Sequence, residues 1–123
     1  MSLNTWEVRS ANPDVVSHVI HITGAGTSVP TMQEPSASAG IAIARTSAGF
    51  LTFTWTDEPG NFLGCTFGFG GTTSANMAGH TAVFTSYASK VLTVKIYDAA
   101  DAIDDLELTE FLCINAMFKR TNV

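Results

Sequence analysis

The sequence is short of charged residues. Only 14% of its 123 residues are charged and 46% are hydrophobic, whereas about a quarter of an average soluble domain is charged. Eleven acidic residues outnumber six basic ones, which gives a formal net charge of -5. An acidic chain has no electrostatic attraction for nucleic acid or for an anionic membrane. Both partners are therefore excluded, and a surface so poor in charge is typical of a protein that assembles with others.

Targeting and membrane signals are missing as well. The opening segment MSLNTWEVRS has no basic stretch followed by an apolar one, so we expect no secretory signal and synthesis in a cytoplasm. No apolar run approaches the ~18 residues of a membrane helix. The two cysteines, Cys65 and Cys113, lie in separate predicted strands at a spacing that matches no metal or redox motif. Two buried thiols are expected rather than a disulfide.

Sustained helical periodicity is also absent. No segment repeats apolar residues at the helical period of about 3.6 over three turns. Instead apolar and polar residues alternate, as they do on strands that are buried on one face. This pattern favours an all-β fold, either an antiparallel β-sandwich or a jelly-roll-like barrel. The predicted strands are Thr5–Arg9, Val15–Thr23, Gly40–Thr46, Phe50–Asp57, Asn61–Gly70, Thr81–Tyr87, Val91–Tyr97 and Leu106–Lys119.

A chain of this length fits one domain, so we expect a single β domain over residues 1–123. Residues 23–40, TGAGTSVPTMQEPSASAG, are rich in Gly, Pro, Ser and Ala. Pro30 and Pro35 each remove a backbone donor that a sheet ladder would need. We interpret this stretch as a long surface loop, with room for one short edge strand at Val29–Met32.

Residues 49–71, GFLTFTWTDEPGNFLGCTFGFGG, are predicted to form a hairpin, because Pro59 and Gly60 suit a tight turn. Alternation gives each of its strands one apolar face. On the first strand this face holds Leu51, Phe53 and Trp55, and on the second it holds Leu63, Cys65, Phe67 and Phe69. The opposite face of the second strand carries Gly64, Gly68 and Gly70, which predicts either a bend or close approach by a backbone or a large ring.

The last predicted strand is apolar on both faces. One face holds Leu106, Leu108, Leu112, Ile114 and Phe118, and the other holds Phe111, Cys113 and Met117. An antiparallel strand normally keeps one face in water, and large exposed apolar patches are rare on monomers. We therefore predict a subunit interface. Its candidate residues are Phe62, Phe84, Tyr97, Phe111, Cys113 and Met117.

The sequence offers no cofactor motif and no catalytic one. The segment DAADAIDDLELTE clusters carboxylates, and Asp98, Asp101, Asp104 and Asp105 are the candidates for a calcium ion. Their spacing matches no EF-hand, so a solvated loop without metal is the expectation. His18 and His21 are three apart, which on a strand places them on opposite faces and prevents joint metal binding.

A small hydrolase would need His80 to meet a serine and an aspartate in space, and no strained nucleophile turn is present in the sequence. We therefore expect no enzyme activity.

The order of these features resembles small tailed-phage virion proteins. The resemblance lies in the segments ITGAG, GFLTFTWTD, NFLGCTFGF and VKIYDAADAIDDLELTEFLCINAMFKR and covers roughly Val19 to Arg120. It implies a capsid decoration, head-fibre or other accessory protein: a compact, non-enzymatic β domain, often trimeric, that is made in a host cytoplasm and locked into the virion. The resemblance implies the chain itself and other virion proteins as partners. The long loop at residues 23–40 and the aromatic hairpin depart from the pattern.

A ligand-binding β-sandwich is the rival hypothesis. Aromatic side chains such as Trp6, Trp55 and Tyr87 would form a sugar-stacking platform if they faced outward. Trp55 is in phase with Phe53 and Leu51, which favours the core for this ring. This hypothesis places the aromatic side chains in a groove flanked by the acidic loop and a calcium ion, and a glycan screen with and without chelator distinguishes it from a virion structural protein.

Overall fold

The computed structural model describes residues 15–33, 40–71, 80–108 and 110–119. These residues form strands and contain no helix. The strands are β1 (Val15–Thr23), β2 (Thr31–Met32), β3 (Ile41–Ser47), β4 (Phe50–Trp55), β5 (Asn61–Gly71), β6 (Thr81–Ala88), β7 (Val91–Tyr97) and β8 (Glu110–Lys119). The predicted strand Thr5–Arg9 lies outside the described residues.

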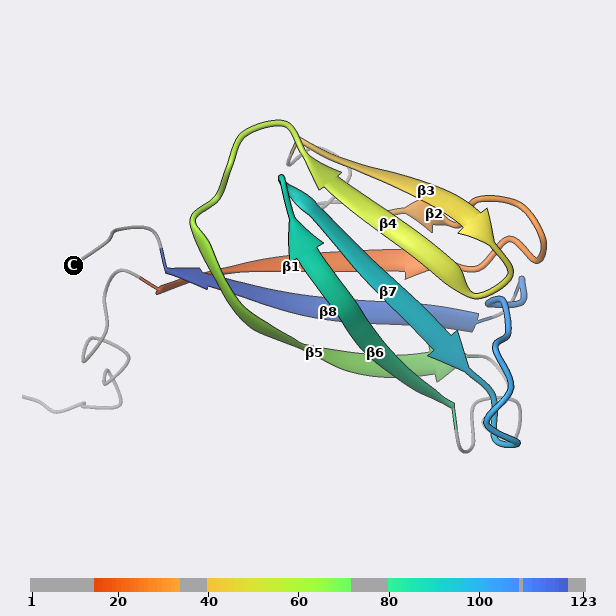
Figure 1. Ribbon diagram of the computed structural model, residues 1–123. Helices are drawn as coiled ribbons and strands as arrows, with labels where there is room; N and C mark the ends of the chain where they lie inside the picture. The colour runs from red at the N-terminus through yellow and green to blue at the C-terminus, as the bar shows by residue number, and fades with distance from the viewer. Residues whose placement is uncertain (1–14, 34–39, 72–79, 109, 120–123) are drawn as a thin grey trace, which may run out of the picture.

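Two four-stranded antiparallel sheets pack face to face (Figure 1). The first sheet has the order β2-β1-β8-β5 and the second has the order β3-β4-β7-β6. Within the described ranges no ladder joins one sheet to the other. The all-β prediction is confirmed, and of its two alternatives the structure takes the sandwich.

The core fills the space between the sheets, because alternation turns every second side chain inward. β7 shows the pattern most simply: Leu92, Val94 and Ile96 are buried, while the residues between them are partly exposed. Among the described residues the buried apolar side chains are Ile20, Ile22, Ile41, Leu51, Phe53, Trp55, Leu92, Val94, Ile96, Leu106, Leu112, Ile114, Ala116 and Phe118.

Most strand positions follow the sequence prediction closely. β1 and β7 have the predicted bounds, and β3 to β6 differ from theirs by at most two residues. The last strand is shorter than predicted and begins at Glu110. Before it the chain turns, since the amide of Glu107 donates to Oε1 of Glu110 at 2.8 Å and the amide of Glu110 donates to the carbonyl of Glu107 at 3.0 Å. Leu106 is buried in the preceding loop, while Leu108 is 72% exposed and leaves the predicted apolar face.

The predicted hairpin of residues 49–71 is wrong. β4 pairs with β3 and β7 in the second sheet, whereas β5 pairs with β8 at the edge of the first. The chain crosses from one sheet to the other at Asp57–Gly60 (Figure 1). The apolar faces of β4 and β5 do contact the same core, but from opposite sheets of the sandwich. The sequence pattern is the same for strands that face one another and for strands that lie side by side.

A register shift in β5 also changes one of its predicted faces. The shift falls between Phe62 and Gly64. It leaves Leu63 54% exposed, while Phe62 packs against the core. Beyond the shift Cys65, Phe67 and Phe69 contact the core as predicted.

The glycines of β5 are not equivalent. A Cβ added at Gly70 would overlap the Phe111 ring, whereas an added Cβ at Gly64 or Gly68 would meet nothing within 4 Å. The predicted approach of a large ring therefore holds at Gly70, and Gly64 and Gly68 have no close neighbour.

The stretch at residues 23–40 is described except for residues 34–39. Its short edge strand is present as β2, which pairs with β1 through Ile22 and Thr23. Before β2 the amides of Gly24 and Gly26 donate to the carbonyls of Glu110 and Leu106 at 2.8 and 3.0 Å. These bonds hold this part of the loop against the segment that enters β8.

Candidate functional site

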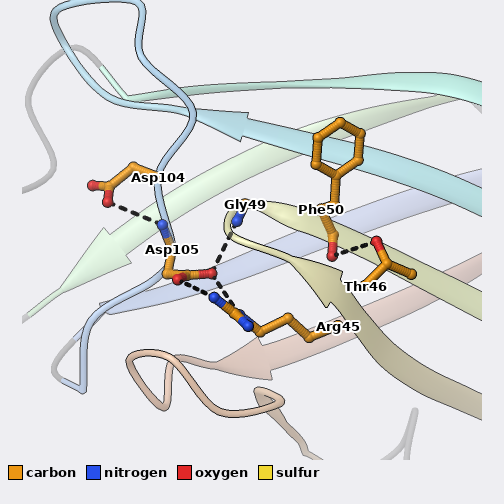
Figure 2. A network of polar contacts seen from close by, with 6 residues as sticks. All are labelled: Arg45, Thr46, Gly49, Phe50, Asp104 and Asp105. Carbon is orange, nitrogen blue, oxygen red and sulfur yellow. Dashed lines mark hydrogen bonds and ion pairs between the residues drawn. The ribbon is translucent and has the colours of Figure 1, made fainter.

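The acidic loop that follows β7 is built around Asp105. Its carboxylate accepts two hydrogen bonds from the Arg45 guanidinium, at 2.9 and 2.8 Å, and a third from the amide of Gly49 at 2.9 Å (Figure 2). Arg45 occupies an inward position near the end of β3, so its side chain reaches the loop across the end of the sandwich. The hydrogen bonds from Arg45, followed by that from Gly49, hold the pKa of Asp105 below its ordinary value although burial acts against them. The network fastens the β3–β4 turn to the acidic loop.

The other carboxylates of the loop make local bonds. Asp98 Oδ1 accepts hydrogen bonds from the amides of Ala100 and Ala102, at 2.8 and 3.0 Å, and Asp104 Oδ1 accepts one from the amide of Asp105 at 3.0 Å. Among the described residues no three His, Cys, Asp or Glu side chains are grouped to hold a metal ion. The four calcium candidates, Asp98, Asp101, Asp104 and Asp105, therefore form no ligand set. Asp98 and Asp105 instead fix the shape of the loop.

His80 lies near one of these carboxylates. Its Nε2 is 4.0 Å from Oδ2 of Asp104, its side chain is 8% exposed, and its ring lies 5.9 Å from that of Phe69. Nδ1 has no hydrogen-bond partner within the described part of the chain. A hydrolase would need a serine hydroxyl on the nitrogen that faces away from the aspartate. The described residues therefore supply two members of such a triad, at a long distance, and no nucleophile.

The remaining histidines and the cysteines divide between the two faces of the first sheet. His18 lies opposite the buried Ala116 and His21 lies opposite Cys113, so the histidines point to opposite faces as predicted. His18 Nδ1 accepts a hydrogen bond of 2.9 Å from the Trp55 indole, and burial lowers the pKa of His18.

Cys65 faces the core and Cys113 faces outward, because their register partners in the sheet are Ala116 and Gly68. Both thiols are free and partly buried. Side chains on opposite faces of one sheet cannot form a disulfide. Burial raises the pKa of the Cys65 thiol to about 11, so this thiol stays protonated and unreactive near neutral pH.

An aromatic cluster fills one end of the core. Phe118 is fully buried, and its ring lies 5.2 Å from that of Trp55, 5.4 Å from that of Tyr87 and 5.6 Å from that of Phe62. Tyr87 and Phe62 stack at 5.0 Å with an interplanar angle of 16°, and Phe84 meets Phe62 edge-on at 5.1 Å. The prediction that Trp55 belongs to the core is confirmed, since this ring is 2% exposed.

A groove of about 700 Å³ opens beside this cluster. Its walls are the β4–β5 connection, the β6–β7 turn and the end of β8. The lining residues are Glu58, Gly60, Asn61, Phe62, Tyr87, Ala88, Ser89 and Lys119. The Tyr87 hydroxyl donates a hydrogen bond of 2.6 Å to Oε1 of Glu58, and burial, together with this bond, raises the pKa of Tyr87. The groove therefore combines an aromatic floor with a carboxylate, an amide and an ammonium group.

Of these lining residues, the sequence predicts only Tyr87 as a sugar-stacking side chain, and it predicts Phe62 as an interface residue. Glu58 and Gly60 fall in the predicted hairpin turn, and Lys119 falls at the end of the last predicted strand. No local pattern could have grouped them, because they meet only through the crossing of the chain between sheets.

The six predicted interface residues occupy three separate places. Phe62 and Phe84 lie together where β5 and β6 run along the same side of the sandwich, and Phe84 is 42% exposed. Tyr97 ends β7 in the other sheet, opposite Thr81. Phe111, Cys113 and Met117 share the outer face of β8, in register with Thr23, His21 and Ser17 of β1.

The outer face of the first sheet contains exposed apolar side chains on β1, β5 and β8. Val19 is 50% exposed, Leu63 is 54% exposed, and Phe111 is 38% exposed although its ring lies 5.5 Å from that of His21. We refer to the surface made by Val19, Phe111, Cys113 and Met117 as the outer apolar face. β5 continues this face toward the sheet edge with Gly64, Thr66, Gly68 and Gly70.

Comparison with protein-family models, with curated proteins and with solved structures found no match. In the described residues no helix is long and apolar enough to cross a membrane. Function must therefore be inferred from the surfaces described above.

Proposed function

We propose that this chain is a non-enzymatic structural protein of a phage virion, a capsid decoration or other accessory protein that acts by self-assembly. The observation that carries the proposal is the outer apolar face of the first sheet. Apolar residues on a solvent-facing sheet surface are typical of an interface, and burial of such a face contributes about 25 cal/mol per Å². The resemblance of the sequence to small tailed-phage virion proteins is the reason for proposing that the assembly belongs to a virion.

The charge distribution supports self-assembly. Val19, Phe111, Cys113 and Met117 carry no charge, and no Asp, Glu, Lys or Arg lies between them on this face, where their neighbours are Ser17, His21 and Asn115. The chain has few charged residues in all, and depletion of charge at the centre is the compositional mark of interfaces. The proposed assembly is a trimer or another homo-oligomer, made in a host cytoplasm and then bound to other virion proteins. No cofactor is part of it.

Solution mass tests the proposal directly. Size-exclusion chromatography with light scattering is expected to give an oligomer for the native chain and a smaller species for Phe111→Glu. Thr54→Glu is the matched control, because Thr54 is exposed on the outer side of β4, a central strand of the second sheet. Circular dichroism checks that both variants keep their strands. A monomeric native chain, or an oligomer that Phe111→Glu leaves intact, contradicts the proposed face.

A second candidate function is carbohydrate or other ligand binding, and the groove beside Tyr87 is the observation that favours it. Sugar sites combine an aromatic surface with carboxylate and amide groups, and here Phe62 and Tyr87 lie beside Glu58 and Asn61. A glycan screen with and without chelator tests this function. Binding that Lys119→Ala and Asn61→Ala abolish would favour it, and a screen without any bound glycan would count against it.

A further inference from the structure

β5 is the last strand of the first sheet, and no described strand pairs with its outer edge. β5 has β8 on one side only, so one row of its backbone donors and acceptors faces away from the sheet. The opposite edge of the same sheet is β2, which has two residues and follows directly after Pro30. The β5 edge has eleven residues. One edge is therefore short and next to a proline, and the other is long and open within the described part of the chain.

The usual devices that protect an edge strand are missing from most of β5. Proteins protect such edges with charged side chains, proline or bulges. The sequence of β5, NFLGCTFGFGG, contains no charged residue and no proline. Its single register shift lies near its start, between Phe62 and Gly64. From Cys65 to Gly71 the strand pairs with β8 without interruption, so this part forms a regular edge.

The surface beside this edge carries small side chains and no charged residue of β5. Thr66 and Gly68 are exposed, and a Cβ placed at Gly68 would meet nothing within 4 Å. Leu63 adds an exposed apolar side chain. On the same side of the sandwich, β6 (TAVFTSYA) also has no charged residue, and Val83 and Phe84 are 45% and 42% exposed. A strand that approaches β5 on this side meets no charged side chain of β5 or β6.

From these features we propose that β5 pairs with β5 of a second copy of this chain, antiparallel and about a two-fold axis near Thr66, the middle residue of the strand. A two-fold contact uses the same surface twice, so an uncharged, self-complementary edge is what it requires. The pair joins the first sheets of both copies into one continuous sheet. The outer apolar faces then lie side by side on that sheet, which doubles the surface available for docking on a virion.

This inference rests on the proposed self-assembly but uses a different surface. It also makes a different prediction about stoichiometry. A pairwise contact makes the dimer the smallest assembly, whereas the virion proteins that the sequence resembles are often trimeric.

Thr66→Lys in the full chain tests the proposed pairing, because it places one lysine from each copy close to the two-fold axis. We expect dimerisation to weaken by roughly tenfold or more, since like charges facing across a strand pair repel. Thr54→Lys, the same change at an exposed position of a central strand in the second sheet, is expected to leave the dimer unchanged. Light scattering over a wide range of concentration measures the dissociation constant, and circular dichroism confirms that both variants fold.

Hydrogen exchange of the β5 amides gives an independent measurement. The outward-facing amides of Cys65–Gly71 are expected to become protected as protein concentration rises, and Thr66→Lys is expected to remove that protection. An oligomer whose β5 amides exchange rapidly, or which Thr66→Lys leaves intact, overturns the edge pairing but leaves the proposed function standing. Concentration-independent protection in a monomer shows that the edge is covered within one chain and overturns both self-assembly and the pairing.

Discussion

The contact between Gly70 and Phe111 gives a sharp test of how the first sheet is packed. The two residues are direct register partners on β5 and β8. A Cβ added at Gly70 would overlap the Cε1 and Cζ atoms of the Phe111 ring, so the ring occupies the space that a side chain at this position would fill. Gly68 stands two residues away on the same face of the same strand, and a Cβ there would meet nothing within 4 Å. The pair of glycines therefore separates the effect of the ring from the general effect of glycine in a strand.

Gly68→Ala and Gly70→Ala are expected to change the free energy of unfolding in opposite directions. Alanine in place of a strand glycine is favourable by roughly 0.5–1 kcal/mol where the backbone and the surroundings allow it, and Gly68→Ala should gain about this much. Gly70→Ala should instead lose about 1–2 kcal/mol, because overpacking costs roughly 1–3 kcal/mol. Part of this cost can be relieved, since Phe111 is 38% exposed and its ring can move outward.

A double-mutant cycle in urea denaturation measures the coupling. In the Phe111→Ala background the ring is gone, so Gly70→Ala should become neutral or slightly stabilising. The coupling free energy between the two changes is then about 2 kcal/mol, within the range known for residues in contact. Equal stabilities for Gly68→Ala and Gly70→Ala, or a coupling free energy near zero, would refute the view that the ring covers Gly70.

Three further outcomes follow from the structure. Phe118→Ala should lower the free energy of unfolding by about 3–5 kcal/mol, because this fully buried ring joins the aromatic cluster; urea denaturation measures the loss. Asp105 has a folded-state pKa below its ordinary value of 3.8, so its stabilisation is present above that value and is lost as pH falls through the folded-state pKa; acid unfolding of Asp105→Asn should show a weaker pH dependence there than the native chain. The Cys65 thiol, with a pKa of about 11, should resist labelling at neutral pH in folded Cys113→Ser and react on unfolding; rapid labelling of the folded variant in mass spectrometry would contradict its burial.

The strand positions could be predicted because they depend on neighbours in sequence. Where one face is buried, as in β1 and β7, alternation alone gives the bounds. Alternation fails where the chain leaves the pattern. Leu63 breaks it through the register shift in β5, and Leu108 breaks it because the chain turns before β8 starts at Glu110.

The pairing of strands could not be predicted in the same way. Pro59 and Gly60 turn the chain, but a turn has the same residues whether it joins two strands of one sheet or carries the chain to the other sheet. β4 already has a strand on each side in the second sheet, which leaves no place there for β5. The sheet that β5 joins therefore depends on the topology of the whole domain and cannot be read from residues 49–71 alone.

The candidate surfaces show the same division between local and global information. The apolar outer side of β8 could be predicted from alternation, since Phe111, Cys113 and Met117 are in phase. The groove could not, because Glu58 and Lys119 come together only when both sheets are in place. The partner of Asp105 was also beyond prediction, since Arg45 lies sixty residues away in the chain.

The excess of aromatic rings finds most of its explanation inside one chain. Trp55, Phe62, Tyr87 and Phe118 cluster at one end of the core, so these rings need no partner subunit. Among the described residues two phenylalanine rings remain exposed on the surface: Phe84 beside Phe62, and Phe111 over Gly70. The exposed aliphatic side chains near the β5 edge and on the outer face are Val19, Leu63 and Val83. Large protruding rings would anchor a contact in a pocket of a partner, whereas a flat sheet with an open edge suits contact through the backbone and through small side chains. The distribution of rings therefore favours assembly by extension and stacking of the first sheet, with the aromatic cluster holding the shape of each copy.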